Sequence, residues 1–480
     1  MSAADAETYD LLVVGGGPAG LAAAIEASSA GLAVGLVDER PTLGGQIYKQ
    51  LGLGFRVVRP SSLGRDYLRG RALIAAAETS GARLLTSTSA VAVRDGEVVV
   101  VADGEHARKV VARRILVAPG AHDRPVVFPG WTLPGVLTAG AAQTIVKTQR
   151  VLPGERIVFA GSGPLALAFP AQLHHYGANV LLALEAGHRP GVRDLLRLAA
   201  AAPGNVSLLR DAGVYRSQLL RARVPLRYSR IVVRAEGAGR VEQVVHAAVD
   251  ADWRVIEGTE ERVEADTLCV GYGLFPSVEL LRLAGCDLAY DEDRGGPVVV
   301  DEWMRTTVAG ISAAGDGAGV AGSYVAIDEG RLAALGAALD LDAVAPETVR
   351  ERAKPIRARL LRKQAFGRAL RPLHSVGTGI YALATDETVV CRCEEVTKAE
   401  LDEAIAASPD LNVVKGFTRA GMGLCQGKSC QRQIAALIAR RHRLPLASVP
   451  LATPRSPVRP VPLGAVADET VEDLGLFVGE

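Results

Sequence analysis

The sequence predicts an α/β fold with two dinucleotide-binding βαβ units, followed by a small helical module that carries four cysteines. Two stretches each combine a short apolar strand, a glycine turn, a helix and a second strand that ends in an acid. Near the C-terminus, Cys391 and Cys393 form a CxC pair, and Cys425 and Cys430 form a CxxxxC pair after a gap of 31 residues. With 480 residues, the chain is long enough for several domains.

The first βαβ unit runs from Tyr9 to Asp38. Residues 11–14 have the pattern of a buried strand, a glycine turn opens an alanine-rich helix, and residues 33–37 form a second strand. The glycines allow a tight turn and close approach of a pyrophosphate, and the helix N-terminus attracts its phosphates. Asp38, after the second strand, is placed to accept hydrogen bonds from an adenosine ribose. We therefore expect a dinucleotide at Gly15, Gly17, Pro18, Ala19, Gly20, Asp38 and Glu39.

Three further segments indicate that this dinucleotide is a flavin. ERPTLGGQIYK (39–49), ILVAPGA (115–121) and GISAAGDGAG (310–319) resemble, in this order, flavin-binding segments of the two-dinucleotide-domain flavoproteins, the family of glutathione and thioredoxin reductases. The resemblance implies FAD and adds Gly45, Gln46, Ala118, Gly120, Gly315 and Asp316 to the expected cofactor-binding residues. Disulphide reductases of that family carry a redox CxxC, and QIYKQLGLG after Gly45 has no cysteine. Dithiol chemistry at the flavin is therefore not expected.

The second βαβ unit has strands at residues 156–160 and 180–184. Gly161 and Gly163 form its turn, Ala166 replaces the third glycine, and Glu185 follows the second strand, where an acid favours NAD over NADP. We expect NAD or another adenine nucleotide at Gly161, Gly163 and Glu185. The alternative is that this unit keeps its fold for structure alone.

The four cysteines predict an iron–sulfur cluster, because two close thiolate pairs brought together by a fold supply its four ligands. The whole chain has six cysteines, so two tight pairs are not a scatter of core residues. Zinc is the closest rival, and a degenerate or disulfide-bonded site is the third alternative. Thr397 and Glu400 form a capping box ahead of one helix, and Cys430 begins another. The module resembles the bacterioferritin-associated-ferredoxin type of [2Fe–2S] domain, which implies a cluster held by Cys391, Cys393, Cys425 and Cys430.

The expected domains follow the order of these motifs. The basic linker is a solvated helix, a docking surface for another subunit or a phosphate-binding segment. The proline-rich tail cannot pack as a helix, and we expect it to wrap the surface or touch a partner. We expect an FAD domain in two parts (1–150 and 276–345), an inserted dinucleotide domain (151–275), the basic helical linker (346–385), a [2Fe–2S] domain (386–445) and the tail (446–480).

The order of these domains resembles the large subunit of bacterial hetero-oligomeric amine dehydrogenases, the group of D-hydroxyproline dehydrogenase, opine oxidase and hydrogen cyanide synthase. The phrases FPGWTLPGV (128–136) and KGFTRAGMGLCQG (415–427) also resemble this group. The resemblance implies an electron relay, in which a smaller FAD subunit oxidises the amine and this chain passes the electrons on. A small third subunit or a ferredoxin-like acceptor is a further expected partner. The rival hypothesis is a self-contained NAD(P)H-dependent FAD/[2Fe–2S] reductase, and a scaffold with vestigial cofactors is the third.

Composition limits the remaining possibilities. The net charge of +1 gives no electrostatic case for nucleic acid or an anionic membrane, and no apolar run approaches the length of a membrane helix. The acidic, polar N-terminus lacks the pattern of a secretory signal. We expect a cytoplasmic protein, with membrane association through partners as the alternative. No catalytic acid or base stands out beside the flavin segments, and the sequence does not identify the amine.

Overall fold

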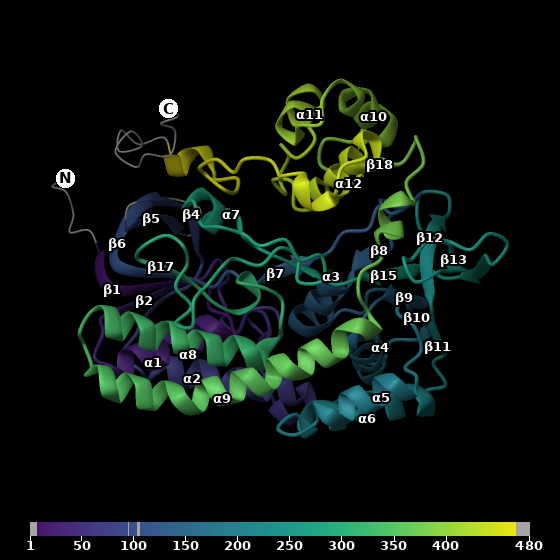
Figure 1. Ribbon diagram of the computed structural model, residues 1–480. Helices are drawn as coiled ribbons and strands as arrows, with labels where there is room; N and C mark the ends of the chain where they lie inside the picture. The colour runs from purple at the N-terminus through teal and green to yellow at the C-terminus, as the bar shows by residue number, and fades with distance from the viewer. Residues whose placement is uncertain (1–6, 95, 103–105, 467–480) are drawn as a thin grey trace. The chain divides into compact units, whose positions relative to one another are not determined.

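The computed structural model describes residues 7–94, 96–102 and 106–466. These residues divide into two compact units (Figure 1). Unit 1 consists of residues 1–121, 275–364 and 454–480, and unit 2 of residues 122–274 and 365–453. The first six residues of the chain and residues 467–480 of the expected tail lie outside the described part.

Unit 1 is built on a seven-stranded sheet with the order β3-β2-β1-β6-β5-β4, in which β17 also pairs with β6. Strands β1, β2, β3 and β17 run parallel to their neighbours, whereas β4, β5 and the first half of β6 form an antiparallel meander. The strands are β1 (Glu7–Val14), β2 (Val34–Val37), β3 (Arg83–Leu85), β4 (Thr88–Arg94), β5 (Glu97–Ala102), β6 (His106–Val117) and β17 (Ile311–Ala313). The two strands expected in the first βαβ unit are confirmed as β1 and β2.

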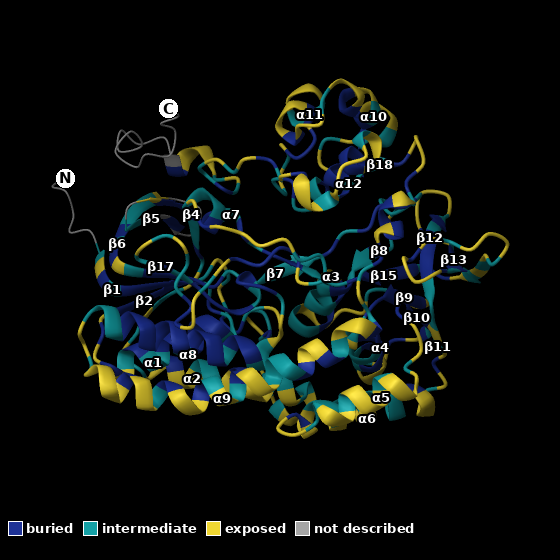
Figure 2. Cartoon of the chain, in the orientation of Figure 1, coloured by how far each residue is buried: buried dark blue, intermediate teal, exposed yellow. Residues whose placement is uncertain are grey.

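The helices of unit 1 include α1 (Pro18–Ser29), α2 (Arg65–Glu78), α7 (Glu279–Leu283) and α8 (Ser323–Asp340). Helices α1 and α8 pack so closely that a Cβ on Gly330 would lie 2.1 Å from the carbonyl oxygen of Ala19. Small residues along α1 make this approach possible, and much of α8 is buried (Figure 2).

The basic linker forms α9 (Pro346–Leu370), and much of its charge is paired within unit 1. Arg352 binds Glu26 of α1 at 2.6 Å. Arg359 and Lys363 both bind Asp328 of α8, whose carboxylate is 2% exposed. These contacts favour a structural helix over a free docking surface for this part of the linker.

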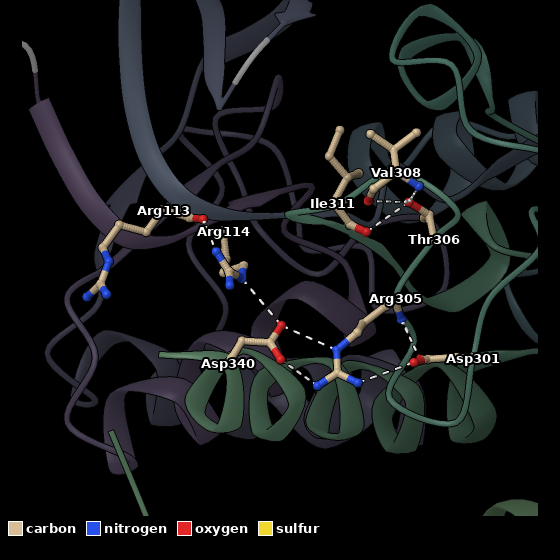
Figure 3. Close-up of polar contacts among 8 residues, drawn as sticks. All are labelled: Arg113, Arg114, Asp301, Arg305, Thr306, Val308, Ile311 and Asp340. Atoms are coloured by element: carbon tan, nitrogen blue, oxygen red, sulfur yellow. Dashed lines mark hydrogen bonds and ion pairs between the residues drawn. The ribbon is translucent and has the colours of Figure 1, made fainter. Parts of the chain in front are cut away.

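A second polar network fixes the loop that leads into the Gly-Asp segment (Figure 3). Asp340, at the end of α8, accepts hydrogen bonds from Arg114 of β6 and from Arg305. Arg305 also binds Asp301, and the Thr306 hydroxyl contacts the carbonyl oxygen of Ile311 at 2.9 Å. The start of β17 is thereby tied to both α8 and β6.

Unit 2 contains a five-stranded parallel sheet with the order β11-β10-β9-β15-β8 and an antiparallel sheet with the order β12-β13-β14. The strands are β8 (Val136–Thr138), β9 (Ile157–Gly161), β10 (Val180–Glu185), β11 (Leu226–Tyr228), β12 (Arg230–Glu236), β13 (Gln243–Ala248), β14 (Glu261–Glu264) and β15 (Thr267–Gly271). The short strands β7 (Ala121–Asp123) and β16 (Leu274–Pro276) pair with each other. The two strands expected in the second βαβ unit correspond to β9 and β10.

The boundary expected at residue 150 differs from the structure, in which unit 2 begins at His122. The physical reason is β8, which pairs with β15 and therefore belongs to the second sheet although it precedes β9 in the chain. The helices between these strands are α3 (Ala139–Thr144), α4 (Pro164–His175), α5 (Val192–Ala200) and α6 (Val206–Arg221).

The cysteine module packs within unit 2 around its own apolar core. It consists of β18 (Val389–Cys391), β19 (Val396–Thr397), α10 (Lys398–Ala407), α11 (Leu411–Thr418) and α12 (Gln431–His442). The capping box is confirmed: Thr397 accepts from the Glu400 amide, and the Glu400 carboxylate accepts from the Thr397 amide at 2.7 Å. The helix after Cys430 is confirmed as α12, whereas α11, capped by Asp410, is a third helix that the sequence patterns did not predict.

Residues 446–453 of the proline-rich tail belong to unit 2, and residues 454–466 belong to unit 1. The Val458 amide donates to the carbonyl oxygen of Val91 at 2.9 Å, and its side chain joins the core. Arg459 pairs with Glu39. This agrees with the expectation that the tail follows the surface as an extended segment.

Candidate cofactor sites

The four expected flavin segments of unit 1 come together around the first glycine loop. A Cβ on Gly15 would lie 2.2 Å from the carbonyl oxygen of Ala118, and one on Gly45 would lie 2.8 Å from the Cα of Gly17. A Cβ on Gly315 would lie 2.9 Å from the Cβ of Ala19. Segments that are far apart in the sequence thus form one backbone-lined surface.

This surface fits a dinucleotide pyrophosphate. No side chain caps the N-terminus of α1, which leaves the amides of its first turn to a ligand. The nearest atom to a Cβ on Gly17 is the Cα of Gly45 at 3.8 Å, so the loop presents bare backbone at the position where a phosphate approaches. A Cβ on Gly20 would lie 1.9 Å from the carbonyl oxygen of Gly15, which explains the need for glycine there. Pro18 begins α1 and pre-sets its first turn.

The two acids after β2 have different positions. Asp38 accepts hydrogen bonds from the amides of Gly16 at 2.6 Å and Arg40 at 2.8 Å, and burial raises the pKa of its carboxyl. The Glu39 carboxylate instead pairs with Arg459 of the tail. The geometry therefore favours Asp38 as the ribose acceptor and gives Glu39 a structural contact.

Further along the flavin segments, Gln46 accepts a hydrogen bond from Lys49, which is 4% exposed. Asp316 accepts from the amides of Ala321 and Gly322, both at 2.9 Å, and so stabilises its own loop. The segment that includes Gly120 is held by the Ser277 amide, which donates to the Gly120 carbonyl oxygen at 3.0 Å.

Sequence reasoning missed Glu329 beside the Gly-Asp segment. Its carboxyl accepts a hydrogen bond from the Gly315 amide at 2.9 Å, and burial raises its pKa to about 8. A protonated carboxyl at neutral pH can donate a hydrogen bond as well as accept one. Adjacent acids inside an apolar helix, Asp328 and Glu329, are a signal that could have identified it.

The second glycine loop, in unit 2, resembles the first because the acid after its second strand also accepts a hydrogen bond from an amide of the loop. Glu185 accepts hydrogen bonds from the amides of Gly163 at 2.9 Å and Gly187 at 2.8 Å. Its side chain is 7% exposed, and burial raises its pKa to about 7. Gly161 is packed between strands, where a Cβ would lie 2.4 Å from the carbonyl oxygen of Gly271.

The two loops differ in what lies over them. The segment after α9 crosses the second loop: a Cβ on Gly163 would lie 3.2 Å from the His374 ring, and one on Gly187 would lie 2.1 Å from the carbonyl oxygen of Leu373. Gly163 is the counterpart of Gly17, where an added Cβ would have only the Cα of Gly45, at 3.8 Å, within 4 Å. The chain itself therefore occupies space next to the second loop.

The four module cysteines form neighbouring thiols across the two sequence pairs. The Cys391 and Cys430 side chains are hydrogen-bonded, as are those of Cys393 and Cys425, and charge on any of the other three affects Cys430. The Cys430 thiol lowers the pKa of Cys391 to about 6, which favours the thiolate that binds metal. In the described part of the chain, no group of three or more His, Cys, Asp or Glu side chains is placed to hold a single metal ion.

The cysteines also differ in exposure, because Cys391 and Cys430 are buried whereas Cys393 is exposed and Cys425 partly so. A Cβ on Gly423 would lie 2.3 Å from the Cβ of Cys393, so glycine lets the loop approach the thiols. Four thiols that meet in two pairs, Cys391 with Cys430 and Cys393 with Cys425, fit a [2Fe–2S] cluster, in which each iron takes two protein ligands.

Two contacts join the module to the rest of unit 2. The Trp131 indole donates to the carbonyl oxygen of Val389 at 2.6 Å, two residues before Cys391. Buried Gln433 of α12 donates to the Tyr381 carbonyl oxygen at 2.9 Å, and the Tyr381 hydroxyl contacts buried Arg124 at 2.7 Å. Trp131 lies in FPGWTLPGV, so this phrase supplies an anchor for the module.

Comparison with known proteins agrees with both sites. Residues 9–330 match the family model of pyridine nucleotide-disulphide oxidoreductases, and residues 389–440 match the BFD-like [2Fe–2S] binding domain. The chain belongs to the pyridine nucleotide-disulphide oxidoreductase family. The two matches together show that the chain is an FAD-dependent oxidoreductase with a [2Fe–2S] binding domain.

Relatives share nearly the whole chain. An opine oxidase subunit of Agrobacterium tumefaciens (strain Ach5) is 37% identical over 96% of this chain and 91% of its own length. Hydrogen cyanide synthase subunit HcnB of Pseudomonas aeruginosa is 34% identical over 95% of this chain and 97% of its own. The fold also resembles L-proline dehydrogenase from P. horikoshii, with a TM-score of 0.68, 22% identity, and coverage of 97% of this chain and 81% of that one.

Proposed function

We propose that this chain is the electron-relay subunit of a hetero-oligomeric amine or amino-acid dehydrogenase. In this role, FAD bound to unit 1 and a [2Fe–2S] cluster in unit 2 carry electrons from a partner flavoprotein to an acceptor. The observation that carries the proposal is the contrast between the two glycine loops, because Gly17 is open whereas Gly163 lies under His374. A chain with one open dinucleotide site and a cluster module needs an electron donor other than NADH.

The relatives support a partner subunit, because the opine oxidase relative and HcnB are both named as subunits. We therefore propose a smaller FAD-containing subunit that oxidises an opine, hydroxyproline or glycine type of substrate. A small third subunit or a ferredoxin-like protein is the proposed acceptor. The reducing cytoplasm is the proposed compartment, since it keeps cluster thiols free of disulfides.

The cofactors supply the redox chemistry: FAD takes up two electrons and gives them up singly, and the cluster carries one at a time. The residues of the chain bind and orient these groups. Asp38 and the amides that begin α1 would hold the adenosine and pyrophosphate, and Glu329 fixes the Gly315 amide. Cys391 and Cys430 would hold the cluster from the buried side, while Cys393 and Cys425 face solvent, where an electron can leave.

The rival is a self-contained NAD(P)H-dependent reductase, which would need the second loop to accept a nicotinamide dinucleotide. The close approach of the His374 ring to Gly163 and of the Leu373 carbonyl oxygen to Gly187 supports the view that this loop has less room for such a ligand. We therefore propose that the second βαβ unit, with Gly161, Gly163 and Glu185, keeps its fold without NAD or another adenine nucleotide.

Anaerobic stopped-flow spectroscopy of the purified protein distinguishes these functions. We expect NADH to leave the flavin absorbance unchanged, and the partner subunit with its amine substrate to bleach it rapidly. Rapid bleaching by NADH alone would establish the reductase instead. A matched variant, His374→Ala, shows whether the covering ring keeps the dinucleotide out, because NADH should bind this variant more tightly than the wild type.

The cluster is tested separately. Cys425→Ser should remove the cluster absorbance, leave the FAD content unchanged and stop transfer from the partner to the acceptor. Cys286→Ser is the control, because Cys286 is a free thiol in the core of unit 1. Full transfer to the natural acceptor by the Cys425 variant would place the cluster outside the electron route.

A further inference from the structure

Helix α5 in unit 2 turns its apolar face to solvent. Val192 is 74% exposed, Leu195 57% and Leu196 66%, and the spacing i, i+3, i+4 places them on one stripe. None of the nine residues of this helix is buried, and the half-buried ones, Asp194 and Leu198, lie on other positions of the helix. An amphipathic surface helix normally directs its apolar stripe at the core, so this orientation is reversed.

Helix α6, which follows α5 in the chain, also has exposed apolar residues. Val206, at its first position, is 66% exposed, and Leu220 in its last turn is 61% exposed. Residues 201–205 join the two helices, and both helices show exposed residues in Figure 2. The surface formed by α5 and α6 is hereafter called the α5–α6 surface.

Positive charge surrounds these side chains. Residues 189–223 contain seven arginines, two aspartates and no other charged residue, a local net charge of +5 in a chain whose total is +1. All the arginines except Arg216 are exposed. Asp194 is already engaged, since its carboxylate accepts from the Gly191 amide at 3.0 Å and pairs with Arg197 at 3.6 Å. The cationic groups therefore dominate the field at this surface.

We propose that the α5–α6 surface binds the face of an anionic lipid membrane. Val192, Leu195 and Leu196 enter the boundary between headgroups and acyl chains, and the arginines bind lipid phosphates. A short apolar stripe flanked by arginine is the pattern of an interfacial helix. Six exposed arginines beside an exposed aliphatic stripe complement the phosphates of an anionic lipid surface, and this favours lipid over a protein partner.

The attachment is peripheral. In the part of the chain that the structure describes, no helix is long and apolar enough to cross a membrane. The proposal does not rest on the electron-relay function, because every residue that carries it lies in α5, α6 or the arginines around them.

Flotation of the full-length holoprotein with vesicles tests the proposal. We expect binding to vesicles of phosphatidylcholine with phosphatidylglycerol, weaker binding at high salt, and little binding to phosphatidylcholine alone. Leu195→Glu/Leu196→Glu should lower the affinity for the anionic vesicles by more than about tenfold. Arg193→Gln should lower it by about fivefold.

A control variant has the same change of charge elsewhere. Leu53→Glu/Leu463→Glu alters two leucines of unit 1 that are 76% and 85% exposed, and it should bind vesicles nearly as the wild type does. Flavin and cluster absorbance show that each variant is folded. The proposal is overturned if the wild type ignores anionic vesicles, or if Leu195→Glu/Leu196→Glu binds them unchanged. Unchanged vesicle binding with loss of a co-purifying subunit would assign the α5–α6 surface to a protein partner.

Discussion

Glu185 should make the stability of unit 2 fall as the pH rises from 5 to 8. Its carboxyl is 7% exposed, and burial raises its pKa from 4.5 to about 7. Between pH 4.5 and pH 7 this carboxyl is ionised in the unfolded chain but still protonated in the folded one. A rise in pH through this range therefore favours unfolding. The stability that this group contributes is complete below pH 4.5 and is lost as the pH passes 7. A shift of this size corresponds to about 3 kcal/mol, at about 1.4 kcal/mol for each pKa unit.

Glu185→Gln removes the titration and keeps the size of the side chain. We expect the variant to lose less stability than the wild type between pH 5 and pH 8, by about 3 kcal/mol. Comparing the two free energies of unfolding at a single pH is less informative. The Glu185 carboxyl uses one oxygen for the Gly163 amide and the other for the Gly187 amide, whereas a carboxamide has only one oxygen.

Urea unfolding monitored by tryptophan fluorescence measures this difference. The chain has three tryptophans, and Trp303→Phe leaves only Trp131 and Trp253, both in unit 2. The unfolding free energies of the two proteins are compared in this background from pH 5 to pH 8. Buried His246, whose pKa burial lowers to about 4, titrates in both proteins and cancels in the difference. Parallel pH profiles would show that the Glu185 carboxyl is ionised in the folded protein and would refute the reasoning.

Two substitutions test the geometry of the remaining contacts. Gly20→Ala places a methyl group 1.9 Å from the carbonyl oxygen of Gly15, so α1 must move at a cost of about 1–3 kcal/mol, and the purified protein should lose most of its FAD. Gly367→Ala, where a Cβ has no neighbour within 4 Å, should keep it, and equal flavin content in both would contradict the packing argument. Trp131→Phe removes the hydrogen bond to Val389 and should lower the free energy of unfolding of the cluster module by about 1 kcal/mol, measured by urea-induced loss of cluster absorbance. An unchanged midpoint would mean that the indole does not anchor the module.

The local elements and the flavin loop could be predicted from sequence because each depends on neighbours in the chain. The strand patterns of residues 11–14 and 33–37 stand on either side of a glycine turn and a helix, and the structure has β1, α1 and β2 there. The capping box of Thr397 and Glu400 follows the same local logic. The convergence of Gly15, Ala118 and Gly315 agrees with the order of the flavin segments, which a family resemblance encodes and local propensity does not.

What could not be predicted depends on long-range packing. β8 has the composition of any short strand, and only its pairing with β15 puts residues 122–150 in unit 2. The sequence spacing pairs Cys391 with Cys393, yet the thiol of Cys391 meets that of Cys430. The contact of His374 with Gly163 joins residues that are far apart in the chain, and no local sequence pattern predicts it.

These long-range contacts give the second βαβ unit a different role from the first. Trp131, which precedes β8 of the same five-stranded sheet, binds the strand that carries Cys391. Gln433, on the helix that follows Cys430, binds the Tyr381 backbone, and the Tyr381 side chain reaches Arg124. The segment that brings Tyr381 to these partners is the one that covers Gly163. Covering the second glycine loop and anchoring the module are therefore done by one stretch of chain, residues 371–382. A ligand that displaced residues 373–374 from this loop would therefore also disturb an anchor of the module. The proposal that the second loop holds no nucleotide thus implies that this stretch stays in place and keeps the module attached.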